Sequence, residues 1–212
     1  MDLIKLFFNF VLHLDIYLGQ IISTYGILTY VILFGIIFVE TGLVFIPFLP
    51  GDSLLFASGA FSALGAMNVY ILLVILSIAA ILGDTVNYWI GFFFGKALIA
   101  NPKVPIEQKH IDKTNKFFEK YGGKTIIMAR FIPIIRTFAP FVAGVGRMNY
   151  AKFVSYNVIG GLLWVFTATL AGYFFGNIPI VKENFSIIII AIVFISIIPM
   201  LIPVIVEFLR KK

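Results

Sequence analysis

Four charged side chains lie in two apolar, proline-containing segments of this chain. Glu40 begins the first segment and Asp52 ends it, and Arg130 and Arg136 lie on either side of a proline in the second. A charged side chain at the centre of a bilayer costs about 2.5 to 3.5 kcal/mol on insertion scales. Four such charges beside helix-breaking residues are difficult to explain as packing, so they mark a candidate site.

The arginines indicate a substrate that carries a phosphate group. A guanidinium stays charged and offers planar pairs of donors that fit phosphate oxygens. Pro133 separates Arg130 from Arg136, so they do not share one regular helical face, but a kinked hairpin can turn both into one cavity. The alternative is structural: the arginines pair with Glu40 and Asp52 and hold two hairpins together. Both interpretations hold if substrate phosphate displaces a carboxylate.

The two acids suggest proton coupling. A carboxyl group whose charged neighbours change during a transport cycle can bind and release a proton. Glu40 ends a long apolar stretch and has no simple structural explanation. Asp52 has one, because it follows Pro50 and Gly51 and could cap a helix over 53–61.

Further polar residues lie near these charges in the sequence. Asp84 is a third acid, within the apolar stretch 69–95, and it either lines a cavity or makes a hydrogen bond between helices. Asn87 and Thr137 are further candidates for lining the cavity. Helix-breaking residues are expected at the hairpin turns, namely Pro47, Pro50, Gly51, Pro133 and Pro140.

Other kinds of chemistry lack the residues they need. The chain has no cysteine, which excludes disulfides, thiolate chemistry and cysteine-based metal sites. Its two histidines are isolated, and no HExxH, GxSxG or P-loop pattern is present. We therefore expect no metal, no cofactor and no enzymatic activity.

The composition of the chain predicts the kind of helices that position these residues. Of the 212 residues, 61% are hydrophobic and 12% are charged, and the mean hydropathy is +1.06. This composition is typical of an integral membrane protein. We predict one all-α membrane domain over 1–212, with about four transmembrane helices of roughly 20 residues each and an amphipathic N-terminal helix.

Apolar and basic segments predict the topology. Segments 47–67 and 124–147 are interrupted by Pro, Gly and charge, so we predict re-entrant hairpins there. Seven lysines cluster near the middle of the chain, and the positive-inside rule places that loop and both termini in the cytoplasm. The predicted segments are an interfacial helix over 1–24, a first repeat over 25–95, the basic loop over 96–123, a second repeat over 124–176 and a final span over 185–209.

Three short patterns occur twice in the same order. They are Phe45-Ile46-Pro47 with Phe131-Ile132-Pro133, Met67-Asn68 with Met148-Asn149, and the Gly-aromatic-Gly segments 91–95 and 172–176. Each match alone is weak, but together with opposite hairpin polarity they predict an inverted-topology repeat. The substrate site of such a repeat lies where the two broken segments meet near the midplane. Two acids would then face two arginines.

Longer motifs extend over much of the chain, namely Phe-Leu-Pro-Gly-Asp-Ser-Leu-Leu-Phe at 48–56, Gly83-Asp84, Asn87-Tyr88, Gly122–Ile126, Ala129–Gly144 and Tyr156–Gly160. They resemble those of the DedA family of membrane proteins over about residues 25–180. The resemblance implies two facing re-entrant hairpins and a role in moving lipids across the bacterial cytoplasmic membrane. It also implies that the family's functional acids fall on Glu40 and Asp52, and its functional arginines on Arg130 and Arg136.

The resemblance also implies particular substrates. Family members are implicated in returning undecaprenyl phosphate, the carrier lipid of envelope synthesis, to the inner leaflet, and others in flipping phosphatidylethanolamine. Dependence on the proton motive force is also associated with the family. We therefore expect a proton-coupled transporter of undecaprenyl phosphate in the bacterial inner membrane. The alternatives are a phosphatidylethanolamine flippase or scramblase, and a proton-coupled antiporter of small ions or drugs.

Non-transport functions and other partners fit less well. A membrane phosphatase needs a nucleophile or general acid that the motifs do not supply, and an envelope assembly factor needs no intramembrane charge. Nucleic acid is not an expected partner, because the lysines lie between apolar blocks without an arginine cluster. The sequence leaves the oligomeric state open, a homo-oligomer included.

Overall fold

Every regular element that the structure describes is a helix. The computed structural model describes residues 14–43, 51–100, 108–176 and 178–179. The predicted all-α class is confirmed for these residues. The helices are α2 Leu14–Tyr25, α3 Leu28–Gly42, α4 Gly51–Ala63, α5 Val69–Ala100, α6 Gln108–Tyr121, the 3-10 turn η1 Gly122–Lys124, α7 Thr125–Ala129, α8 Pro133–Val145 and α9 Tyr150–Phe175.

Several predicted features lie outside the described residues. They are the first 13 residues of the interfacial helix, the turn residues Pro47 and Pro50, and the final span over 185–209.

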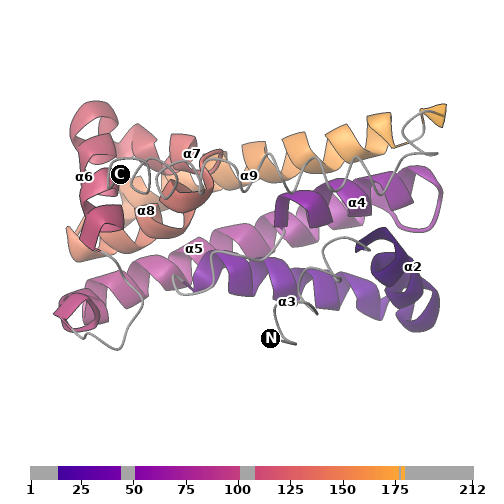
Figure 1. Ribbon diagram of the computed structural model, residues 1–212, viewed down its shortest axis with the longest axis horizontal. Coiled ribbons are helices and arrows are strands. Elements are labelled where there is room, and N and C mark those ends of the chain that lie inside the picture. Colours follow the sequence, from indigo (N-terminus) through magenta and orange to yellow (C-terminus); the bar gives the residue numbers. More distant parts are fainter. Residues whose placement is uncertain (1–13, 44–50, 101–107, 177, 180–212) are drawn as a thin grey trace, which may run out of the picture.

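Two long helices, α5 and α9, form the axis of the molecule (Figure 1). They have 32 and 26 residues and are therefore about 48 and 39 Å long. Within the described residues, Val69–Gly95 and Tyr150–Phe175 are long and apolar enough to cross a bilayer. The two helices thus supply the frame on which the shorter elements pack.

The shorter helices cover the two halves of this axis (Figure 1). α2, α3 and α4 lie along one half, and α6, α7 and α8 lie along the other. α4 packs mainly against α9, whereas α8 packs mainly against α5. In addition, α3 packs against α5 and α7 packs against α9. Each half therefore places one short helix against each of the long helices.

Each half has its own apolar packing. Along α5, the first core ends at Ala80 and the second begins at Tyr88. Along α9, the second core reaches Phe153 and the first begins at Trp164. The buried acid Asp84 lies between the two cores along α5.

Glycines allow the helices of each half to approach closely. A Cβ at Gly59 of α4 would collide with the carbonyl oxygen of Thr169 of α9, and a Cβ at Gly172 of α9 would collide with that of Phe56 of α4. The other half has the same reciprocal contacts, from Gly91 of α5 to Phe141 of α8 and from Gly144 of α8 to Tyr88 of α5.

The basic segment 96–123 is not a simple loop, contrary to the prediction. α5 continues to Ala100, and α6 occupies Gln108–Tyr121. α6 is amphipathic: Ile111 is buried in a cluster with Phe138 and Phe141 of α8, while Lys116 and Lys120 are exposed. Because this apolar stripe packs on α8, the segment forms a helix. The net charge of the segment alone does not indicate this.

The prediction that Pro140 forms a turn is also wrong, because α8 continues through it. A proline inside a helix removes one backbone hydrogen bond. Here the helix persists because Phe138, Ala139 and Phe141 around the proline are buried. The other proline of this helix, Pro133, stands at its first position, after Ile132 in an extended conformation.

Candidate functional site

The buried charges form two clusters between the apolar cores. We call them the Arg136 cluster and the Arg130 cluster. The expectation that two acids face two arginines is corrected, because both predicted acids bind the same arginine. The Arg136 cluster consists of Arg136, Glu40 and Asp52, and the Arg130 cluster consists of Arg130, Asp84 and Asn157.

In the Arg136 cluster, one guanidinium bridges two carboxylates. Its Nη2 donates to Oε1 of Glu40 at 2.9 Å, and its Nη1 donates to Oδ1 of Asp52 at 3.0 Å. The side chain of Asp52 is 25% exposed, against 9% for Arg136 and 3% for Glu40. With both carboxylates ionised, the cluster carries one positive and two negative charges. It is thus unbalanced in charge and accessible from the side of Asp52.

The end of α3 and the start of α4 bring the two acids together. Glu40 lies in the last turn of α3 and Asp52 in the first turn of α4. Asp52 is inside the helix rather than preceding it, so it is not the capping residue that the sequence suggested. Gly51 leaves no room for a Cβ, because the Glu40 carboxylate occupies that position. The Oε2 atom of Glu40 is buried and has no hydrogen-bond partner among the described residues.

The Arg130 cluster is balanced in charge and closed. Nη2 of Arg130 lies 2.7 Å from Oδ2 of Asp84, and it also donates to Oδ1 of Asn157 at 2.6 Å and to the carbonyl of Ala80 at 3.2 Å. The amide of Asn157 donates in turn to the carbonyl of Ile81 at 2.9 Å. The side chains of Arg130 and Asp84 are 1% and 3% exposed. This cluster therefore joins α5, α9 and the turn after α7.

Trp164 of α9 lies between the clusters, and the sequence did not single it out. Its Nε1 donates to Oδ1 of Asp52 at 2.6 Å. The Cζ atoms of Arg136 and Arg130 lie 4.8 and 5.7 Å from the centroid of its ring, both within the range of a cation–π contact. A tryptophan in an apolar span usually indicates packing, so its sequence carries no signal of this role. Asn157 was likewise missed as a partner of Arg130.

Asn87 joins the two halves next to the clusters. Its Nδ2 donates to the carbonyl oxygens of Thr137 at 2.9 Å and of Thr41 at 3.3 Å. Asn87 is fully buried. Asn87 and Thr137, which were expected to line a cavity, are thus connected through a backbone carbonyl, and Asp84 is held by Arg130.

Comparison with known proteins places the chain among membrane proteins. Residues 49–174 match the VTT domain, a range that holds every cluster residue except Glu40. Over 208 residues the chain is 54% identical to protein DedA of Escherichia coli (strain K12), which covers 97% of this chain and 95% of that protein. No solved structure matches the chain.

Two further relatives are more distant. An uncharacterized membrane protein of Mycobacterium tuberculosis (strain ATCC 25618 / H37Rv) is 46% identical over 170 residues, which is 79% of this chain and 74% of that protein. The inner membrane protein YqjA of Escherichia coli (strain K12) is 37% identical over 152 residues, which is 71% of this chain and 69% of that protein. None of these names describes an enzymatic activity.

Proposed function

The chain belongs to the DedA family of membrane proteins, and we propose that it moves a phosphate-bearing lipid across the bacterial cytoplasmic membrane. The observation that carries the proposal is the Arg136 cluster. Two carboxylates orient the Arg136 guanidinium in a buried site, and one of them, Asp52, has a side chain that is 25% exposed. A phosphate offers the same planar oxygen pairs as a carboxylate, so it can replace one of them on Arg136.

In the proposed cycle, the lipid phosphate displaces a carboxylate while the lipid tail stays in the bilayer. Asp52 is the more exposed acid, so it is the first to leave. A carboxylate that loses its positive partner in a poorly solvated site binds a proton more readily. Asp52 and Glu40 thereby couple proton uptake to phosphate binding. We assign the phosphate to Arg136 and not to Arg130, because the side chains of Arg130 and its acid Asp84 are only 1% and 3% exposed, whereas the Arg136 cluster is open at Asp52.

We propose that α3–α4 and α7–α8 are the two re-entrant hairpins of an inverted repeat. The first of them begins earlier than the predicted segment 47–67, because it takes α3 as its first arm. They lie toward opposite ends of the molecule, each followed by a long helix (Figure 1). The reciprocal glycine contacts support a relation between the α4–α9 pair and the α8–α5 pair. The basic α6 supports a cytoplasmic location for the end at which it lies. With this orientation, α2 and the start of α3 lie at the opposite end (Figure 1), where the Asn68 N–H donates to the Tyr30 hydroxyl, so the expected cytoplasmic N-terminus is not part of the proposal.

Undecaprenyl phosphate is the substrate that we propose first, because a lipid monophosphate can take both donors of Arg136 without a second recognition group. A specific observation favours phosphatidylethanolamine as the second candidate. The Arg136 cluster has one cation and two acids, which complements a zwitterion with its phosphate on Arg136 and its ammonium on a carboxylate. An antiporter of small ions or drugs, with the carboxylates binding the cation, is the remaining alternative.

Reconstitution into proteoliposomes tests the proposal. Head-group-labelled undecaprenyl phosphate and phosphatidylethanolamine are followed between leaflets, with and without a pH gradient, for the wild type, Arg136→Ala and the exposed control Lys116→Ala. We expect exchange with the wild type and the control, accelerated by the gradient, and only background exchange with Arg136→Ala. Equal exchange in all three proteins would defeat the mechanism. Ion flux without lipid exchange would support the antiporter instead.

A further inference from the structure

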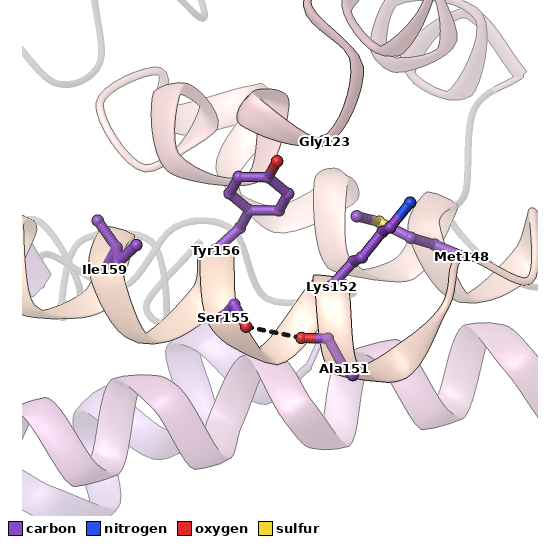
Figure 2. A pocket seen from close by; sticks show the side chains of 7 residues that line it. All are labelled: Gly123, Met148, Ala151, Lys152, Ser155, Tyr156 and Ile159. Atoms are coloured by element: carbon purple, nitrogen blue, oxygen red, sulfur yellow. Dashed lines mark hydrogen bonds between the residues drawn. The ribbon is translucent and has the colours of Figure 1, made fainter.

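A groove of about 560 Å³ lies between η1 and the first turns of α9, away from both charge clusters (Figure 2). Gly123 borders it on the η1 side, and Met148, Lys152, Tyr156 and Ile159 border it on the side of α9. A Cβ at Gly123 would collide with the ring of Tyr156. The absence of a side chain at this position therefore allows Tyr156 to pack under η1.

Two polar side chains of the groove have no partner among the residues that the structure describes. Figure 2 shows Lys152 and Tyr156, one helical turn apart, projecting from α9 toward the side where Gly123 lies. Within the part of the chain that the structure describes, no acidic side chain pairs with Lys152 and the Tyr156 hydroxyl makes no hydrogen bond. An ammonium and a phenolic hydroxyl at this spacing offer two donors to one anionic group.

The surroundings of the groove are also positively charged. Lys124 follows Gly123 directly, and Arg147 precedes Met148 directly; both side chains are exposed. Lys152 is exposed as well, and the Arg147 guanidinium lies over the ring of Phe92, 5.3 Å from its centroid. A basic groove at this place attracts anionic groups from its surroundings.

An apolar stripe continues from the groove along α9. Ile159, Leu163 and Phe166 are 48%, 48% and 40% exposed, and they follow Tyr156 at intervals of three and four residues. This spacing places them on the same helical face as Tyr156. The rings of Trp89 and Tyr150 meet 5.2 Å apart at the start of α9, as expected where a helix enters the membrane interface. The groove is thus polar at the interface and continues as an apolar surface into the bilayer.

We propose that this groove binds an anionic phospholipid of the surrounding membrane. Its phosphate lies between Lys152 and Tyr156, and an acyl chain follows Ile159 and Leu163. The ligand is an amphiphile rather than a soluble anion, because the free donors and the exposed apolar stripe are continuous on one helical face. The lipid is resident and not transported, so the proposal stands independently of the function proposed above.

Native mass spectrometry of the full-length protein in detergent tests the proposal. Binding of dioleoylphosphatidylglycerol is compared with that of dioleoylphosphatidylcholine. We expect the anionic lipid to bind more tightly, and Lys152→Gln to weaken it about fivefold, the loss typical of one lysine at a membrane surface. Tyr156→Phe keeps the ring under η1 and removes only the hydroxyl, so it should weaken the same lipid while leaving the thermal unfolding midpoint unchanged.

Lys116→Gln is the matched control, because it removes one exposed positive charge from α6. It should leave phosphatidylglycerol binding unchanged. An equal loss in Lys116→Gln and Lys152→Gln would overturn the proposal in favour of general surface charge. Equal binding of both lipids to the wild type would overturn it too. Displacement of phosphatidylglycerol by equimolar inorganic phosphate would identify a soluble-anion site instead.

Discussion

The Arg136 cluster and the Arg130 cluster both pair an arginine with carboxylates, but they differ in charge balance and in exposure. Arg130 meets one acid and is 1% exposed, so its charge is balanced and closed off. Arg136 meets two acids, one of which is 25% exposed, so its cluster has a carboxylate in excess and contact with the outside. A balanced, closed pair can hold helices together. An unbalanced, partly open cluster can exchange one partner for another.

This difference separates the two arginines, although both stand in one short segment of the chain. Asp84 on α5 and Asn157 on α9 bind Arg130, so this arginine fastens the turn after α7 to the two long helices. Arg136 on α8 reaches across to α3 and α4, the elements of the other half. The contrast predicts a structural role for Arg130 and a substrate-binding role for Arg136.

Removing one acid from each cluster tests the contrast most strongly. Asp84→Asn leaves the Arg130 guanidinium buried without a counter-charge, and arginine cannot lose its proton. We expect the free energy of unfolding to fall by about 3 to 5 kcal/mol. Glu40→Gln leaves Arg136 with Asp52 as its counter-charge, and the glutamine oxygen can still accept from Arg136, so the free energy of unfolding should fall by only about 1 to 2 kcal/mol. Denaturant unfolding in detergent measures both.

The contrast also predicts a rescue. Arg130→Met combined with Asp84→Leu removes both charges and replaces them with apolar side chains, which should restore most of the stability lost in Asp84→Asn. If Asp84→Asn and Glu40→Gln destabilise the protein equally, the two clusters do not differ in the way described.

Arg136 is expected to affect transport more than folding. Arg136→Ala should lower lipid exchange in proteoliposomes more than about tenfold, because a pair of charge-assisted hydrogen bonds to phosphate is lost. The protein should remain folded, since the acids it leaves behind can take up protons. Arg136→Lys keeps the charge but cannot present two donors in one plane, so it should recover exchange only in part. Full activity of the lysine variant would argue against bidentate binding.

Trp164 should give the smallest effect of the three. Trp164→Phe keeps an aromatic ring over both guanidinium groups and removes the hydrogen bond to Asp52. We expect a loss of about 1 kcal/mol in unfolding free energy, because one hydrogen bond to a carboxylate is removed. Trp164→Leu also removes the ring and should lower the unfolding free energy further. An unchanged unfolding free energy in Trp164→Phe would exclude a stabilising link between the indole and Asp52.

Some of the site could be predicted because its signal is local. Glu40, Asp52 and Arg136 are charges in apolar surroundings, and that contrast is visible in the few residues on either side. Trp164 could not be found in this way. Its hydrogen bond to Asp52 spans 112 positions in the chain, and an aromatic residue in an apolar span looks like ordinary packing. α6 was missed for a related reason, because its lysines outweigh the apolar stripe that holds it against α8.

The sequence by itself determined that this is an all-helical membrane protein with charged residues inside its apolar segments. These features can be found in the sequence because composition and hydropathy are sums over neighbouring residues. The tertiary structure alone decided which charges meet. Asp84 pairs with Arg130, and both Glu40 and Asp52 pair with Arg136, because glycine contacts set how closely α4 and α8 pack on the two long helices. Charge pairing falls steeply with distance and burial, and those quantities exist only once the helices are packed.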